Sequence, residues 1–167
     1  NEHTRPYLYV RNIDESSGRY DILAIFNWHA DGPLYMTLPV DYLDYRSENP
    51  PIVYDFWRET LLSDNKSDIL LKLPARSSRL LTLQDHRGYP QIVGTSGHPG
   101  QQQVFVTDIG WDAINYVLRG KVKNIEEKPV TVVIYTPQFF NYTDFTCDDT
   151  EAGIAIADDA TIRLFVP

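Results

Sequence analysis

The chain has 167 residues, of which 43% are hydrophobic and 13% aromatic, and its formal net charge is −8. This composition is far from the low hydrophobicity of a disordered chain, and the length suits one domain with a sizeable core. The acidic charge repels phosphate backbones, so nucleic acid is not an expected partner. No segment approaches the roughly 20 apolar residues that span a bilayer, so no membrane partner is expected either.

Short segments rich in β-branched and aromatic residues recur along the chain, each bounded by Gly, Pro, Asp, Asn or Ser. In chain order they are PYLYVRN (6–12), RYDILAIFNW (19–28), IVYDFW (52–57), ILLKL (69–73), RLLTLQ (79–84), QIVGT (91–95), QVFVTDI (103–109), INYVLRG (114–120), VTVVIYTP (130–137), GIAIA (153–157) and TIRLFV (161–166). Only PVDYLDYR (39–46) favours one or two helical turns. The pattern predicts an all-β fold: an antiparallel β-sandwich of about ten to twelve strands, with residues 1–167 as a single domain.

The apolar pattern differs between these segments. Apolar residues fall on both faces of RYDILAIFNW through its middle, which predicts a strand in the interior of the sandwich. ILLKL and RLLTLQ instead place Lys72 and Thr82 among leucines. That mixture predicts strands with one wet face.

Ser96 lies in the stretch GTSGHPGQQ (94–102), which is similar at first sight to the nucleophile loop of chymotrypsin-like proteases. A serine nucleophile needs a histidine base and an orienting carboxylate. Here Thr95 stands where that loop carries Asp, and no Ala-Ala-His-Cys stretch exists. His98 likewise occupies the final glycine position of a G-x-S-x-G elbow, and no helical pattern follows it. No catalytic residue is therefore assigned.

Acidic residues offer weaker candidates. Carboxylates that cleave a glycosidic bond lie about 5 to 9.5 Å apart across a cleft, and the sequence leaves this open for Asp41, Asp44, Asp55, Asp108 and Asp112. The runs at 148–151 and 158–159 favour turns between strands over a calcium site. The single Cys147 excludes an internal disulfide and a zinc site built on a cysteine pair. No metal and no cofactor is expected.

Aromatic rings stack on the apolar faces of sugars, which makes Trp28, Trp57 and Trp111 candidates for carbohydrate contact. A tryptophan at the end of a strand more often packs in a core or against a neighbouring domain. Both alternatives stay open at this stage.

Three stretches in order resemble the C-terminal β-sandwich domain of α-galactosidase-like glycoside hydrolases, the clan of families 27, 31 and 36. YDILAIFNW (20–28) is similar to the Phe-Asn-Trp strand of such domains. VYDFWRETLL (53–62) and ILLKLPARSSRLLTL (69–83) resemble their Tyr-Asp-Phe-Trp strand and Pro-x-x-Ser-x-x-Leu hairpin. YPQIVGTSGHPGQ (89–101) resembles their Pro-x-x-x-Gly-Thr-x-x-His-x-x-Gln segment, although Gly97 and Pro99 depart from it, and residues 138–167 do not align.

The resemblance implies a non-catalytic role. In such enzymes the catalytic aspartates belong to a (β/α)8 barrel, so the chain is expected to be a C-terminal fragment that packs against and stabilises a barrel of the same polypeptide. A secreted or periplasmic location is favoured, GTSGHPGQ becomes an inter-strand turn whose glycines adopt positive φ, and Ser96 becomes a bystander. The residues expected at a carbohydrate or domain interface are Phe56, Trp57, His98 and Trp111.

Two alternatives stand beside this role. The first is a carbohydrate-binding module that uses an aromatic platform. The second is a small free-standing hydrolase that uses carboxylates.

Overall fold

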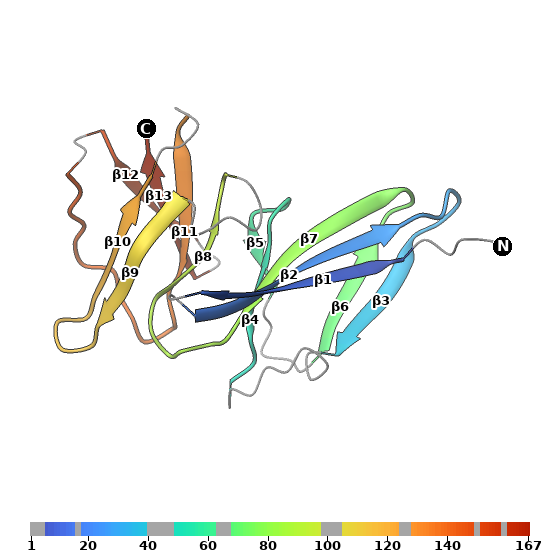
Figure 1. Cartoon of the computed structure of the whole chain (residues 1–167), viewed down its shortest axis with the longest axis horizontal. Coiled ribbons are helices and arrows are strands. Elements are labelled where there is room, and N and C mark those ends of the chain that lie inside the picture. Colours follow the sequence, from blue (N-terminus) through green and yellow to red (C-terminus); the bar gives the residue numbers. More distant parts are fainter. Residues whose placement is uncertain are drawn as a thin grey trace. The chain divides into compact units, whose positions relative to one another are not determined.

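The computed structural model describes residues 6–15, 18–39, 49–62, 68–97, 105–123, 128–148, 151–157 and 160–167. Every secondary-structure element within these ranges is a β-strand, and every pairing between strands is antiparallel (Figure 1). The predicted all-β, antiparallel fold class is therefore confirmed. No helix in the described ranges is long and apolar enough to cross a membrane.

The described ranges hold 13 strands: β1 (Leu8–Glu15), β2 (Gly18–Asn27), β3 (Leu34–Pro39), β4 (Ile52–Asp55), β5 (Thr60–Leu61), β6 (Asp68–Leu73), β7 (Ser77–Gln84), β8 (Gln91–Thr95), β9 (Val106–Asp112), β10 (Val117–Val122), β11 (Val130–Tyr135), β12 (Gly153–Ala157) and β13 (Thr161–Val166). Every segment expected to be a strand overlaps one of them. The two additional strands are β3 and the two-residue β5. They raise the number of strands slightly above the expected ten to twelve. The helical turns expected over 39–46 meet the end of β3 at Pro39, and residues 40–46 lie outside the described ranges.

The chain divides into two compact units, Asn1–His86 and Arg87–Pro167. Each unit has its own sheets and its own hydrophobic cluster. A division into compact units does not establish whether each unit folds alone. The single domain expected from the sequence therefore stays a prediction.

Unit 1 consists of a five-stranded sheet in the order β1-β2-β7-β4-β5 and a two-stranded ribbon of β3 and β6 (Figure 1). The ribbon packs on one face of the sheet, since one cluster joins buried side chains of both layers: Leu23, Ile25, Leu38, Val53, Ile69, Leu71, Leu73, Leu81 and Leu83. β2 lies between β1 and β7 in the sheet, and its Leu23 and Ile25 are fully buried, whereas Ile22, Ala24 and Phe26 on its other face are only partly buried. Burial of both faces, as the sequence predicted, is therefore borne out for one face only. This two-layer arrangement follows from burying one apolar face of each element against the other.

The wet-face prediction holds for one strand and fails for another. β6 alternates as predicted, with Leu71 3% exposed and Leu70 74% exposed. In β7 the prediction is wrong, because Thr82 is only 3% exposed. β7 lies inside the sheet, between β2 and β4, and its last four residues are buried on both faces.

Unit 2 has the same two-layer plan. A four-stranded sheet in the order β12-β13-β11-β8 packs with a ribbon of β9 and β10. The shared cluster contains Ile92, Phe105, Val106, Val130 and Val132, with partly buried Ile109, Leu118, Val122, Ile134 and Leu164 around it. A register shift between Val133 and Ile134 interrupts the pairing of β11 with β8.

The alternation in β6 provides a matched test of the core. We expect Leu71→Ala to lower the free energy of unfolding by about 2 to 5 kcal/mol, because it removes buried methyl groups and leaves a cavity. Leu70→Ala, its exposed neighbour, should change it by less than about 0.5 kcal/mol. Denaturant unfolding followed by tryptophan fluorescence measures both. Equal losses in the two variants would contradict the assigned register.

Candidate functional site

The residues of the first two sequence motifs meet at one end of the five-stranded sheet. β2 ends at Asn27, which pairs with Ser77 at the start of β7. β4 ends at Asp55, which pairs with Leu81 of β7. Because β2 and β4 both run antiparallel to β7, their carboxyl ends lie at the end of the sheet where β7 begins. We call this end of the sheet the motif end, and we include in it the turns that follow Asn27 and Asp55 and the turn that precedes Ser77.

Asn27 holds two loops of the motif end together. Its buried amide nitrogen Nδ2 donates to the carbonyl oxygens of Gly32 at 3.0 Å, Leu73 at 3.1 Å and Pro74 at 2.8 Å. Its Oδ1 accepts the backbone N–H of His29 at 3.0 Å. An amide side chain offers a donor group and an acceptor together, which an apolar or acidic residue of the same size does not. Asn27 therefore has a structural role in this strand motif.

Asp55 also has structural partners. Its Oδ2 accepts a hydrogen bond from Arg79 Nε at 2.8 Å, and Arg79 Nη2 lies 2.6 Å from the same oxygen without a hydrogen bond of its own. Oδ1 accepts the backbone N–H of Arg58 at 3.1 Å. The carboxylate is fully buried, and removing either member of such a pair leaves an uncompensated charge. Asp55 thus fixes the turn that follows β4.

That turn carries the predicted interface residues Phe56 and Trp57. The Phe56 backbone N–H donates to the Leu80 carbonyl at 2.9 Å, which extends the pairing of β4 with β7. The two rings meet edge to face, with centroids 4.9 Å apart and planes at 79°. Trp57 is 61% exposed. The structure therefore brings Phe56 and Trp57 together and leaves the indole at the surface.

A second aromatic group lies at the other side of the motif end. Phe26 and Trp28 stack with centroids 4.9 Å apart and planes at 4°, and Tyr9 meets Phe26 edge-on at 5.8 Å. Tyr7 stacks on His29 and hydrogen-bonds its Nε2 at 3.2 Å. The sequence indicated Trp28 but not its neighbours, because pairing with β1 is what adds the tyrosines.

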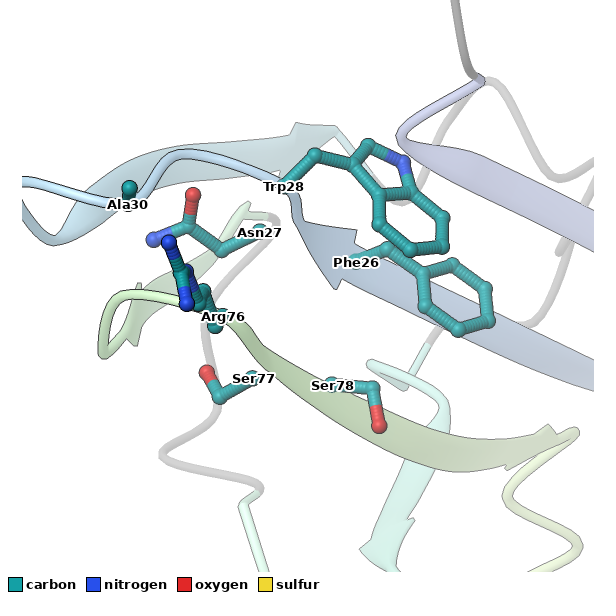
Figure 2. Close-up of a pocket in the computed structure, with 7 residues that line it drawn as sticks. All are labelled: Phe26, Asn27, Trp28, Ala30, Arg76, Ser77 and Ser78. Atoms are coloured by element: carbon teal, nitrogen blue, oxygen red, sulfur yellow. The ribbon is translucent and has the colours of Figure 1, made fainter.

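Beside this stack lies a pocket of about 560 Å³, lined by Phe26, Asn27, Trp28, Ala30, Arg76, Ser77 and Ser78. Figure 2 shows the two rings on one side of it, Arg76 and the Asn27 amide on the opposite side, and Ser77 and Ser78 along β7 below them. Aromatic and polar groups thus face a common space. Of the predicted interface residues that the structure describes, Phe56, Trp57 and Trp111 lie outside its lining, whereas Trp28, a candidate for carbohydrate contact, is part of it.

Trp111, the predicted residue of unit 2, belongs to an aromatic cluster. Its ring stacks on Tyr89 with centroids 5.4 Å apart and parallel planes. The rings of Tyr116 and Phe140 meet the indole edge to face, with centroid distances of 6.3 and 5.5 Å. Tyr89 covers one face of the indole, so a sugar ring would have to stack on the other face. His98 lies outside the described ranges.

The turn after Trp111 depends on a carboxylate. Asp112 Oδ1 accepts the backbone N–H groups of Ile114 and Asn115 at 3.0 Å each, and Oδ2 accepts from the Asn115 side chain at 2.9 Å. The side-chain hydrogen bond from Asn115, followed by its backbone hydrogen bond, holds the pKa of Asp112 below its ordinary value. This carboxylate therefore closes the β9–β10 turn.

The other acidic candidates fall into two groups. Asp108 lies 2.6 Å from Lys121 Nζ, and this hydrogen bond lowers the pKa of Asp108. Asp41 and Asp44, and residues 149–150 and 158–159 of the acidic runs, lie outside the described ranges. Within the described part of the chain, no group of three His, Cys, Asp or Glu side chains has metal-ligand geometry.

Ser96 has a backbone partner. Its hydroxyl accepts the N–H of Thr131 at 2.8 Å, and its own N–H donates to the Thr131 carbonyl at 2.8 Å, which prolongs the β8–β11 pairing. The expected positive φ is wrong for Gly97, since the described glycines with positive φ are Gly18 and Gly88. Gly97 is instead needed for space, because a Cβ there would lie 2.5 Å from the Phe105 ring.

The hydrogen bonds of Asn27 predict the cost of an isosteric change. Asn27→Asp places a carboxylate against three carbonyl oxygens, and we expect it to lower the free energy of unfolding by more than about 3 kcal/mol at neutral pH. Asn141→Asp, at an exposed position, should change it by less than about 0.5 kcal/mol. Chemical denaturation measures both variants. A tolerated Asn27→Asp would show that the three contacts contribute nothing.

The lowered pKa of Asp112 predicts a pH dependence. Its contribution to stability is present above the ordinary value of 3.8 and is lost as the pH falls through the lower folded value. Asp112→Asn keeps the acceptor oxygen but carries no titrating charge. We therefore expect its thermal midpoint to fall less than that of the unsubstituted chain between about pH 5 and pH 2. Calorimetry measures this difference, and identical falls would exclude the role of the charge.

The structure thus gathers Phe26, Asn27, Trp28, Asp55 and Ser77 from separate motifs at one edge of unit 1, while Trp111 forms a cluster within unit 2. No protein-family model, curated protein or solved structure matches this chain.

Proposed function

We propose that this chain is a non-catalytic accessory β-sandwich of an α-galactosidase-type glycoside hydrolase. It packs against a (β/α)8 catalytic barrel of the same polypeptide and stabilises that barrel. A secreted or periplasmic location accompanies this role through the same resemblance. The resemblance itself rests on the order of three motifs, and the arrangement of their residues at the motif end supports the proposal.

The supporting observation is that the polar and the aromatic residues of the motifs lie in different environments. Their polar residues, Asn27 and Asp55, are buried and hold turns through hydrogen bonds. Their aromatic residues Trp28 and Trp57 emerge from those turns at the surface. Such an arrangement fixes exposed aromatic side chains on a rigid scaffold. It suits a surface for contact with another domain.

Trp57 is the best anchor for that contact. Interfaces between domains of one chain bury about 600 to 1,500 Å², and aromatic residues are enriched at interfaces. The indole of Trp57 is 61% exposed, and Phe56 supports it from the side. Covering it would remove apolar surface from water at little conformational cost, because the turn beneath it is already fixed by Asp55.

The second candidate function is a carbohydrate-binding module. The observation that favours it is the pocket beside the Phe26–Trp28 stack, since sugar-binding surfaces combine aromatic faces with a few polar groups. The two functions are compatible, because an accessory sandwich can dock with one surface and bind a glycan with another.

The proposal is tested in the parent enzyme. The complete reading frame should encode a (β/α)8 barrel, and Trp57→Ala in that enzyme should speed thermal loss of glycosidase activity by at least about three-fold, since an apolar contact of about 1 kcal/mol or more is lost. kcat/KM at low temperature should stay within about two-fold of the original value, because the substitution lies away from the chemistry.

Phe139→Ala is the matched control, because Phe139 is an aromatic residue 92% exposed in the other unit. It should leave the rate of thermal inactivation unchanged. A reading frame without a barrel, or equal effects of the two substitutions, would overturn the proposal. Hydrolysis of aryl glycosides by the 167-residue chain alone would support the small-hydrolase alternative instead.

A further inference from the structure

We propose that the pocket at the motif end of unit 1 is a saccharide site, in which a pyranose ring contacts Phe26 and Trp28 and is hydrogen-bonded by Arg76 and Ser78. Of the tryptophans that were candidates for carbohydrate contact, Trp28 lines this pocket, whereas Phe56, Trp57 and Trp111 of the expected interface do not. The site does not depend on a catalytic barrel, because all seven lining residues belong to unit 1.

The aromatic side of the pocket is held in place before any ligand binds. The Phe26 and Trp28 rings are nearly parallel, at 4°, and Tyr9 supports Phe26 with its edge. The indole Nε1 donates to the Pro6 carbonyl at 2.9 Å, which fixes the orientation of Trp28. A fixed ring loses little conformational entropy on binding, so its contact with the C–H groups of a sugar is more favourable.

The opposite side supplies hydrogen-bonding groups. Within the described part of the chain, no partner is present for the Arg76 guanidinium or for the Ser78 hydroxyl. Ser78 lies opposite Phe26 in the strand register. Ser77 Oγ donates to the Pro74 carbonyl at 2.7 Å and keeps its lone pairs as acceptors. Donors and acceptors beside an aromatic wall match the two kinds of surface on a sugar, its hydroxyl rim and its C–H face.

The turn between β6 and β7 fixes the backbone of Arg76. Its φ is +51°, in the left-handed region, and its N–H donates to the His29 carbonyl at 3.0 Å. Glu59, Asp108, Tyr116 and Ala160 also have positive φ and lie outside the pocket lining, so this conformation is not by itself a mark of a ligand site. The backbone hydrogen bond holds Arg76 at the pocket before a ligand binds.

The size and charge of the pocket limit the ligand. About 560 Å³ lies in the usual range for small-ligand sites. The planar guanidinium of Arg76 fits either two neighbouring hydroxyls or a ring carboxylate. The ligand class is therefore a pyranoside, and neutral and acidic sugars are separate arms of the test.

The test is calorimetric titration of the full 167-residue chain with galactose oligomers in one arm and galacturonate oligomers in the other. We expect at least one series to bind with a Kd of about 1 mM or tighter. Trp28→Ala and Arg76→Asn should each weaken that binding at least about ten-fold. Asn tolerates left-handed φ, so Arg76→Asn removes the cation and keeps the turn, and circular dichroism verifies the fold.

Trp57→Ala and Arg58→Asn are the matched controls, since neither residue lines the pocket, and both should bind like the original chain. Absence of binding in both arms up to about 10 mM would overturn the site, as would unchanged affinity in a folded Arg76→Asn variant. Loss of binding only with Trp57→Ala or Trp111→Ala would place the sugar elsewhere and equally exclude it. These outcomes are independent of barrel docking, which is measured in the parent enzyme.

Discussion

At the motif end of unit 1, two connections between its layers depend on one buried amide. The chain crosses between the five-stranded sheet and the β3–β6 ribbon four times: from β2 to β3, from β3 to β4, from β5 to β6 and from β6 to β7. Asn27 bonds to the first of these connections through Gly32, and to the last through Leu73 and Pro74. Buried backbone carbonyls need partners, and one side chain supplies them for two loops. The shared apolar core packs the layers together, and Asn27 joins the two connections at this end.

Carboxylates extend the same principle. The buried Asp55, with Arg79 and the Arg58 N–H, fixes the turn after β4, and the partly exposed Asp112 closes the β9–β10 turn in unit 2. The buried Asp21 accepts from the Asn12 side chain at 2.7 Å and so joins β1 to β2. The charge on each acid strengthens the hydrogen bonds that it accepts. The acidic residues that drew attention as possible catalysts are, where described, engaged in structure.

The aromatic residues divide between the same two tasks of cohesion and exposure. Tyr20 and Tyr54 are buried in the sheet, whereas Trp28 and Trp57 are carried on turns whose backbones are already fixed. A rigid turn lowers the entropic cost of covering the ring that it carries. Two distinct surfaces lie at one end of unit 1, the exposed Trp57 indole and the pocket beside Phe26 and Trp28, and they are the ones that we propose for a domain contact and for a sugar.

The sequence by itself determined the all-β class and the location of most strands, because β-branched and aromatic runs between turn residues are a local signal. It also indicated the wet face of β6, since side-chain alternation follows from the strand period alone. The resemblance of the motifs implied Phe56, Trp57, His98 and Trp111 as residues of a carbohydrate or domain interface, and this stays a prediction.

Only the tertiary structure decided which residues of different motifs meet. The pairing of Asn27 with Ser77 spans 50 positions of the chain (77 − 27) and creates the pocket, and no local pattern contains that register. Thr82 is buried because β7 has a neighbour on each side, and Gly97 is required because the Phe105 ring occupies the adjacent space. The alternation of side chains along one strand predicts which residues share a face. The strand beside it, the burial of a side chain and the space left for it depend on contacts between segments far apart in sequence.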